Sequence, residues 1–130
     1  MKMLRYQLVF LALIISTFSL QSCAQKLEEE HLLLKKTEFK QRLSEEKTPQ
    51  LVDVRTKEEY DQGSIEGAIN YDYLDGTFEK NLEKLDKTRP VFVYCAVGGR
   101  SGKAAKLLKQ KGFTAVIDLK GGYNAWSKSP

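Results

Sequence analysis

Cysteine and histidine are scarce in this sequence of 130 residues, which holds two cysteines and a single histidine. A zinc site needs three or four cysteine, histidine or carboxylate ligands at defined spacings, and neither cysteine has a histidine close to it in the chain. His31 has no acidic partner at a defined spacing, so we interpret it as a partly exposed residue rather than a base or a ligand. The sequence therefore predicts no metal site.

An excess of one sign of charge is also missing. The 21 basic residues face 17 acidic ones, and the two kinds alternate in stretches such as Glu79–Lys87. Interleaved charges are typical of a solvated helix face, so we expect no nucleic-acid partner. No internal repeat and no low-complexity tract is present. The length and the 42% hydrophobic content indicate one soluble globular domain, which we expect to be a monomer.

The longest apolar run of the sequence lies at its N-terminus. Lys2 and Arg5 precede the apolar stretch Leu8–Leu20, which small residues follow. The export machinery recognises this arrangement, and the run is shorter than the roughly 20 residues that cross a bilayer. We therefore predict a signal peptide at residues 1–22. A retained N-terminal anchor helix is the alternative.

The end of this segment, Leu20-Gln21-Ser22-Cys23, resembles the lipobox of bacterial lipoproteins, in which the cysteine is acylated and becomes the mature N-terminus. The resemblance implies lipidation of Cys23, a tether at residues 23–30 and a folded domain at residues 31–130. It also implies an exported protein held at a membrane of the periplasm or cell envelope by its lipid. Ordinary cleavage after Ala24 is the alternative and would give a soluble periplasmic protein.

Short apolar strands alternate with helices along the rest of the chain. The expected strands cover residues 31–36, 50–54, 67–71, 91–94 and 114–119. The expected helices cover residues 38–46, 57–62, 78–85 and 101–111, and residues 121–128 form a last turn or helix. Thr37, Thr56 and Thr77 are placed to cap the first three helices. This order predicts an α/β fold, with a central parallel sheet covered by helices on both sides.

Cys95 stands at the end of an expected strand, where parallel sheets place their ligand sites. Gly98 and Gly99 let the loop after it curl with its N–H groups turned inward, and the following helix N-terminus adds a positive dipole end. Both features favour the reactive thiolate. We predict Cys95 as the nucleophile. The predicted substrate-binding residues are Ala96, Val97, Gly98, Gly99, Arg100 and Ser101. A buried structural cysteine is the alternative.

Two other anion-binding motifs fail in this loop. A P-loop that ended at Gly102-Lys103 would need glycine where Val97 stands and serine or threonine where Ala104 stands. A cysteine phosphatase or arsenate reductase loop sets five residues between its cysteine and its arginine, whereas four separate Cys95 from Arg100. The shorter loop favours a single sulfur atom over a tetrahedral oxyanion.

Four short segments of the sequence resemble motifs of the rhodanese family of sulfurtransferases. They are Cys95–Ser101 (C-x-x-G-x-R-S), Leu51–Arg55 with Glu59 and Tyr60, Gly63–Asn70 (G-H-I-P-G-A-x-N in the family), and Lys120–Gly122 with Trp126. The chain departs from the family pattern at Ser64 and Glu66, where His and Pro are common. It also carries Ala96 where thiosulfate-specialised members often have a basic residue.

The resemblance implies a rhodanese-like sheet of about five strands, no metal and no organic cofactor. It implies a thiosulfate:cyanide sulfurtransferase-like reaction in which Cys95 accepts a sulfane sulfur from thiosulfate, a persulfide or a polysulfide. The resulting persulfide passes the sulfur to cyanide or a thiol. A non-catalytic rhodanese-like module that binds a partner or senses redox state is the alternative.

Five further residues are interpreted as supporting the site rather than reacting. Arg55 and Glu59 can pair across one helical turn, and Asp53 can tie down the loop above its strand. Gly121 and Gly122 suit a close backbone approach to the cysteine loop, and Trp126 is expected in the core.

Overall fold

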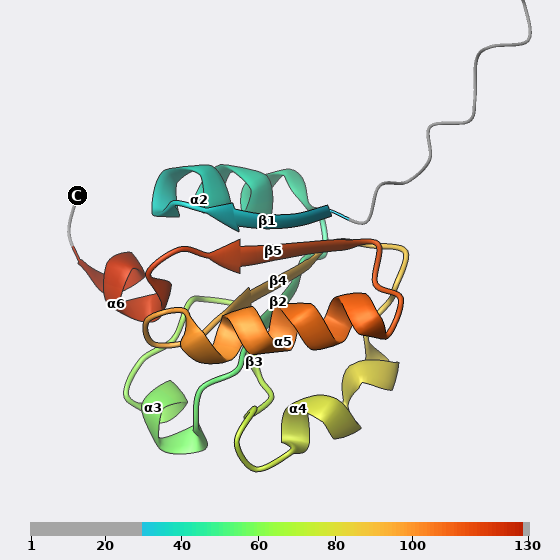
Figure 1. The fold of residues 1–130 in the computed structure, drawn as a ribbon. Coiled ribbons are helices and arrows are strands. Elements are labelled where there is room, and N and C mark those ends of the chain that lie inside the picture. The colour runs from blue at the N-terminus through green and yellow to red at the C-terminus, as the bar shows by residue number, and fades with distance from the viewer. Residues whose placement is uncertain (1–29, 129–130) are drawn as a thin grey trace, which may run out of the picture.

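The computed structural model describes residues 30–128 of the chain (Figure 1). The predicted signal peptide, the predicted lipidation site Cys23 and all of the predicted tether except Glu30 lie outside the described residues. Glu30 itself begins the first strand, one residue before the expected start of that strand.

Five strands form one sheet in which every neighbouring pair is parallel. They are β1 (Glu30–Leu34), β2 (Gln50–Asp53), β3 (Ile69–Asn70), β4 (Val91–Tyr94) and β5 (Ala115–Leu119), in the order β1-β5-β4-β2-β3. The predicted α/β fold with a central parallel sheet is confirmed. All strands point the same way, so their carboxyl ends meet at one edge of the sheet, on the left in Figure 1.

Helices cover both faces of the sheet (Figure 1). They are α2 (Lys36–Glu45), α3 (Lys57–Asp61), α4 (Thr77–Lys80), the 3-10 helix η2 (Leu82–Lys84), α5 (Gly99–Gln110) and α6 (Gly122–Ser127). Phe39 of α2 and Trp126 of α6 pack on one face. Phe78 of α4, Leu82 of η2 and Leu108 of α5 pack on the other.

Strand β4 shows why the sheet strands are apolar on both faces. Val91 and Val93 belong to the core cluster under α5, as does Cys95, which follows the strand. Phe92 and Tyr94 belong to the cluster under α2 and α6. Because side chains alternate along a strand, each face of the sheet receives its own half of the core. The side chain of Cys95 therefore points toward α5.

One of the three predicted helix caps is present in the structure. The cap at Thr56 is confirmed, because its Oγ1 accepts the N–H of Glu59 at 3.3 Å. Thr37 is wrong as a cap, since α2 has already begun at Lys36. Thr77 is wrong too: the Asp75 carboxylate accepts the Thr77 N–H at 2.7 Å, which leaves Thr77 as the first helical residue.

The predicted helix over residues 78–85 is broken at Asn81. The Asn81 side-chain amide donates to the carbonyl of Thr77 at 2.8 Å, beside the backbone N–H of the same residue. Asparagine side chains compete in this way with the regular helix ladder. The chain continues as η2, and Phe78, Leu82 and Leu85 are nonetheless all buried as the pattern predicts.

Helix α5 begins at Gly99 rather than at Ser101. Gly98 precedes it with a φ of 119°, a left-handed conformation that glycine adopts readily, and its carbonyl accepts the N–H of Gly102 at 3.0 Å. Arg100 and Ser101 therefore belong to the first turn of the helix.

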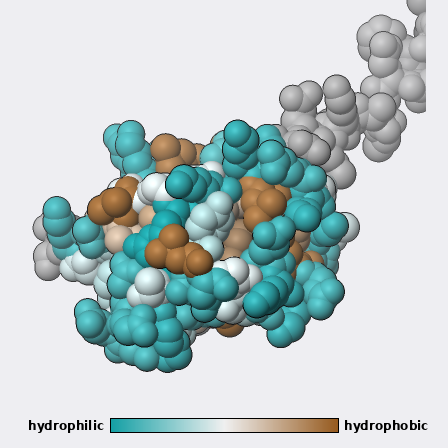
Figure 2. All heavy atoms as spheres, turned by 60° about the horizontal axis from the view of Figure 1, so that its bottom comes forward, coloured by the Kyte–Doolittle hydropathy of each residue, from teal (hydrophilic) through white to brown (hydrophobic). Residues whose placement is uncertain are grey.

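The surface on the side of α3, α4 and α5 is largely hydrophilic, with exposed apolar residues in several separate patches (Figure 2). Among residues 30–128, no helix combines the length and the apolar character that crossing a bilayer requires.

Candidate active site

Cys95 lies at the carboxyl edge of the sheet, directly after β4. It is 1% exposed, and the N–H of Gly98 donates to its sulfur at 3.0 Å. Val97, between the two, is 66% exposed and forms the outer tip of the loop. The loop thus wraps main-chain amides around a sulfur that is closed off from water.

The balance of two effects sets the protonation of this sulfur. Burial raises the pKa of the Cys95 thiol, because the anion loses its hydration. Hydrogen bonds from the side chain and N–H of Ser101, and from the N–H groups of Gly98 and Val97, oppose burial and outweigh it. The pKa of Cys95 therefore lies below its ordinary value of 9.0, and the site favours the thiolate.

The N-terminus of α6 is hydrogen-bonded to the cysteine loop. The N–H of Tyr123 donates to the carbonyl of Cys95 at 2.7 Å, and the N–H of Asn124 donates to the carbonyl of Ala96 at 3.0 Å. A Cβ atom at Gly122 would lie 2.4 Å from the Cys95 carbonyl oxygen, so only glycine fits there. Gly121, with a φ of 79°, turns the chain into this helix.

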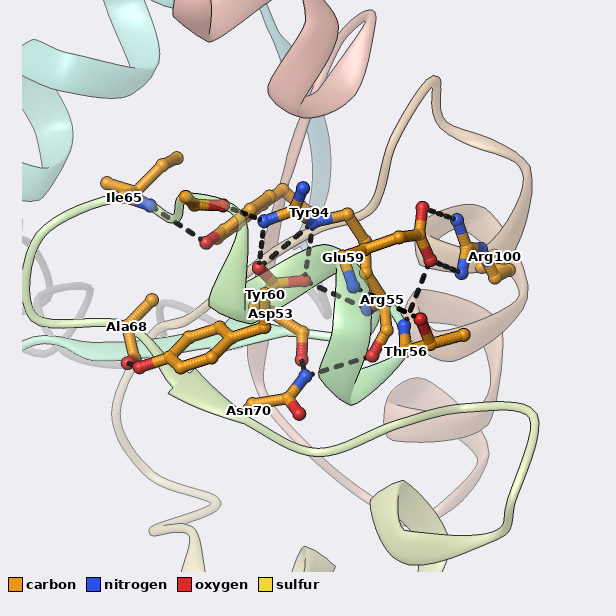
Figure 3. Close-up of polar contacts among 11 residues, drawn as sticks. Asp53, Arg55, Thr56, Glu59, Tyr60, Ile65, Ala68, Asn70, Tyr94 and Arg100 are labelled. Atoms are coloured by element: carbon orange, nitrogen blue, oxygen red, sulfur yellow. Dashed lines mark hydrogen bonds and ion pairs between the residues drawn. The ribbon is translucent and has the colours of Figure 1, made fainter.

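Arg100 is held by Glu59 (Figure 3). Its two terminal nitrogens donate to the two carboxylate oxygens of Glu59 at 2.6 and 2.8 Å. Hydrogen bonds from Arg100, followed by the N–H of Thr56, lower the pKa of Glu59 to about 2. The ion pair joins α3 to the first turn of α5, and the charge of Arg100 is already balanced within the protein.

The predicted pairing of Arg55 with Glu59 is wrong. Arg55 turns toward Asp53, where its Nε lies 3.1 and 3.0 Å from the two carboxylate oxygens and its Nη2 lies 2.7 Å from one of them (Figure 3). The Asp53 carboxylate also accepts the N–H of Arg55 at 2.9 Å. Both residues are buried, and Asp53 supplies the negative charge that balances Arg55. Glu59 is therefore free to pair with Arg100.

Aromatic rings enclose the Arg55 guanidinium. Its central carbon lies 4.2 Å from the ring centre of Tyr123 and 5.6 Å from that of Tyr94, and its Nη2 donates to the carbonyl of Gly63 at 2.6 Å. A cation over an aromatic face is stabilised by the ring quadrupole. The cluster of Asp53, Arg55 and the two tyrosines therefore ties β2, β4 and α6 together beside the cysteine loop.

Sequence reasoning missed several residues of this network. Asn70 donates from its side-chain amide to the carbonyls of Asp53 and Arg55 at 3.1 and 2.9 Å, and the Tyr94 hydroxyl accepts the N–H of Ile65 at 3.0 Å (Figure 3). In the sequence, each of these two residues is a polar residue at the end of an expected strand, and that position is the signal that could have identified them. Trp126 was expected in the core and lies half-buried at its margin, 6.3 Å edge-on from Phe39.

A pocket of about 290 Å³ opens beside the cysteine loop. It is lined by Arg55, Glu59, Gln62, Ala96, Tyr123, Asn124 and Ser127. Its two charged residues are each paired within the protein. In residues 30–128, no group of three or more histidine, cysteine, aspartate or glutamate side chains is arranged to hold a metal ion.

The fold and the site define an α/β domain that holds a buried cysteine, its pKa lowered by hydrogen bonds, in a loop of main-chain amides. The family model described as "Rhodanese-like domain" matches residues 35–129, and the chain belongs to this family.

Relatives agree with this assignment. The chain is 42% identical over 88 residues to "Thiosulfate sulfurtransferase 16, chloroplastic" of Arabidopsis thaliana, covering 60% of this chain and 73% of that one. It is 42% identical over 77 residues to YqhL of Bacillus subtilis, where it spans 60% of that protein's length and 59% of its own. The crystal structure of a rhodanese-like domain protein from Staphylococcus aureus superposes with a TM-score of 0.66 at 32% identity, covering 77% of this chain and 93% of that one.

Proposed function

We propose that this protein is a sulfurtransferase in which Cys95 carries the sulfur as a persulfide. The observation that carries the proposal is the amide ring around a buried sulfur whose pKa lies below its ordinary value. Such a ring stabilises a thiolate, and we expect it also to stabilise the negative charge of a persulfide. The printed name of the Arabidopsis relative supports the same reaction class.

With thiosulfate as donor, the Cys95 thiolate attacks the outer, sulfane sulfur. A new sulfur–sulfur bond forms as the bond between the two donor sulfurs breaks, and sulfite leaves with that electron pair. The product is the Cys95 persulfide anion. No net proton is consumed, and the total negative charge is the same before and after the step.

In the second half of the reaction an acceptor attacks the outer sulfur of the persulfide. Cyanide leaves as thiocyanate, or a thiolate leaves as a new persulfide, and Cys95 returns to the thiolate. Arg100 is held by Glu59, and Ala96 adds no charge at the entrance of the loop. The loop therefore offers little free positive charge to an anionic donor, and we include persulfides and polysulfides as donors beside thiosulfate.

The decisive experiment follows the mass of the intact protein. Treatment with thiosulfate, a polysulfide or an organic persulfide is expected to add one sulfur atom to the wild-type protein and none to Cys95→Ser. Cyanide is then expected to remove that atom as thiocyanate. A wild-type protein that gains no sulfur from any of the three donors would instead be a binding or sensing module.

We also propose that the protein is an exported lipoprotein anchored through Cys23. The lipobox-like sequence Leu20–Cys23 after the apolar run supports this location. The sulfur chemistry would then take place at a membrane surface of the cell envelope, on small anionic donors and thiol acceptors present there.

A further inference from the structure

A buried carboxyl group lies on the same side of the sheet as Cys95. Asp118 belongs to β5 and is 2% exposed. Val116, two residues earlier, packs in the cluster under α5, and so does Val93, which pairs with Asp118 in the sheet register. Because side chains alternate along a strand, Asp118 points toward α5 as Cys95 does. A carboxyl group in an apolar cluster is costly, so its presence calls for a role.

The partners of this carboxyl group are few. The Ser101 side chain and the N–H of Leu119 hydrogen-bond to it, and within the part of the chain that the structure describes its Oδ1 has no hydrogen-bond partner. Burial raises the pKa of Asp118 to about 6, against the opposing effect of these two hydrogen bonds. The carboxyl group thus gains or loses its proton near neutral pH.

Ser101 acts on both groups. It is fully buried in the first turn of α5, and hydrogen bonding from its side chain lowers the pKa of both Cys95 and Asp118. The hydroxyl also lies 3.3 Å from the carbonyl oxygen of Gly98. A serine hydroxyl has one hydrogen to donate, so these three acceptors compete for it.

We propose that Asp118 is a positioning residue that sets the protonation state of Cys95 through the hydroxyl of Ser101. When Asp118 is ionised, Ser101 donates its hydrogen to the carboxylate and Cys95 keeps its proton. When Asp118 is protonated, it donates to the Ser101 oxygen, and Ser101 donates to the Cys95 thiolate. One negative charge resides in the cluster in both states.

The exchange between the two states balances without solvent. The thiol proton moves to the oxygen of Ser101 while the hydroxyl proton of Ser101 moves to the carboxylate of Asp118. No charge enters or leaves the cluster, which matters because Cys95 and Asp118 are both almost fully buried. The carboxyl group therefore stores the proton that Cys95 must lose before it attacks a donor.

Other charged groups lie on the surrounding elements. Arg100 of α5 is bound to Glu59, and the charges of Cys95 and Asp72 both raise the pKa of Arg100. On β1, Leu33 is the register partner of Asp118. His31 lies two residues before it and is influenced by Lys109 of α5. The variants below leave all of these groups in place.

This inference rests on the proposed role of Cys95, and a titration of the full chain tests it. The ultraviolet absorbance of the thiolate is followed against pH, and the curve of Cys95→Ser is subtracted to remove all absorbance changes that do not come from Cys95. The neutral variants are Asp118→Asn and Asp118→Leu, so that one remains if the other fails to fold. Asp86→Asn, an exposed loop residue, is the matched control for the lost charge.

We expect both Asp118 variants to form the thiolate about one pH unit lower than wild type, a roughly tenfold rise in thiolate fraction below the midpoint. Asp86→Asn should titrate as wild type does. In a Ser101→Ala background, Asp118→Asn should shift the midpoint by less than half as much, because the shared hydroxyl is gone.

Unchanged midpoints in Asp118→Asn and Asp118→Leu would overturn the inference, as would a shift of full size in the Ser101→Ala background. Neither result bears on sulfur loading, which is read from the mass of the wild-type protein. If the wild type takes up sulfur but the midpoints stay fixed, only the role of Asp118 fails. If the wild type takes up no sulfur, the proposed function fails whatever the titration shows.

Discussion

The carboxylate of Glu59 holds both terminal nitrogens of Arg100, at 2.6 and 2.8 Å. Glu59 lies in α3 and Arg100 in α5, and 41 positions separate the two residues in sequence. The same carboxylate accepts the N–H of Thr56 and so also completes the N-terminus of α3. The Glu59 carboxylate therefore both caps α3 and holds the arginine of the cysteine loop.

Replacing Glu59 with Gln should lower the free energy of unfolding by about 1 kcal/mol. A charge-assisted, two-point hydrogen bond is lost, but the pair is partly exposed and water replaces some of it. Glu58→Gln is the matched control, because it removes the same charge from the neighbouring exposed position of α3. Urea unfolding at neutral pH measures both. Equal stability of the two variants would contradict the structural role of the ion pair.

The ion pair between Glu59 and Arg100 should make the free energy of unfolding depend on pH in the acidic range. Arg100 lowers the pKa of Glu59 from its ordinary 4.5 to about 2 in the folded protein. A lowered folded-state pKa contributes stability that is fully present above pH 4.5 and is lost as the pH falls toward 2. Unfolding measured at pH 6 and pH 3 should therefore show a larger loss for wild type than for Glu59→Gln. Parallel losses would mean that Glu59 titrates normally.

Removing the buried partner of Arg55 should be far more costly than removing a surface partner. Asp53→Asn leaves a buried guanidinium without its counter-charge, which typically costs about 3 kcal/mol or more. Asp61→Asn breaks the exposed pair with Lys57 and should change stability by less than about 0.5 kcal/mol. Thermal unfolding of the two variants checks this. A difference of under about 1 kcal/mol between them would be inconsistent with the buried cluster.

A single methyl group at Gly122 should disable the site. Its Cβ would meet the carbonyl of Cys95 at 2.4 Å, and backbone on both sides prevents relief. Gly67→Ala is the control, since Gly67 has the same kind of left-handed φ with open space around it. We expect Gly67→Ala to lose about 1 kcal/mol from strain alone. Gly122→Ala should lose roughly 1–3 kcal/mol more, with sulfur transfer about a hundredfold slower. Similar rates in the two variants would rule out the close approach as a constraint on the loop.

Location should depend on Cys23. The wild-type protein is expected to partition into the detergent phase, and Cys23→Ala to remain unprocessed or to appear in the aqueous phase. Cys95→Ser serves as the control, because it removes the other cysteine and should partition as wild type does. Identical partitioning and processing of Cys23→Ala and wild type would argue against the lipid anchor.

The fold was predictable because its signals are local and repeated. Each strand is a short apolar run followed by a polar turn and an amphipathic helix, and that alternation is sufficient to predict a parallel sheet. The helix limits were harder to predict where a short polar side chain competes with the backbone. Asp75 and Asn81 both do so, and neither effect follows from hydrophobic spacing.

The position of Cys95 in its loop followed from sequence, but the partners of the charged residues did not. Arg55 and Glu59 have the spacing of a helical pair, yet Arg55 precedes α3 and faces a buried aspartate two residues away. Which acid meets which base depends on how α3 is placed against α5, and that is a tertiary property. Asp118 was overlooked because one polar residue in a strand pattern gives no sign of what lies across the sheet.

Helix α6 donates two main-chain N–H groups to the carbonyls of Cys95 and Ala96, and it is the last helix along residues 30–128. During synthesis the cysteine leaves the ribosome before the segment that supports it. A growing chain would carry this thiol on an unsupported loop, and the hydrogen bonds that make it reactive would assemble only as the domain is finished. The stabilised thiolate would then arise late, once the whole domain has folded.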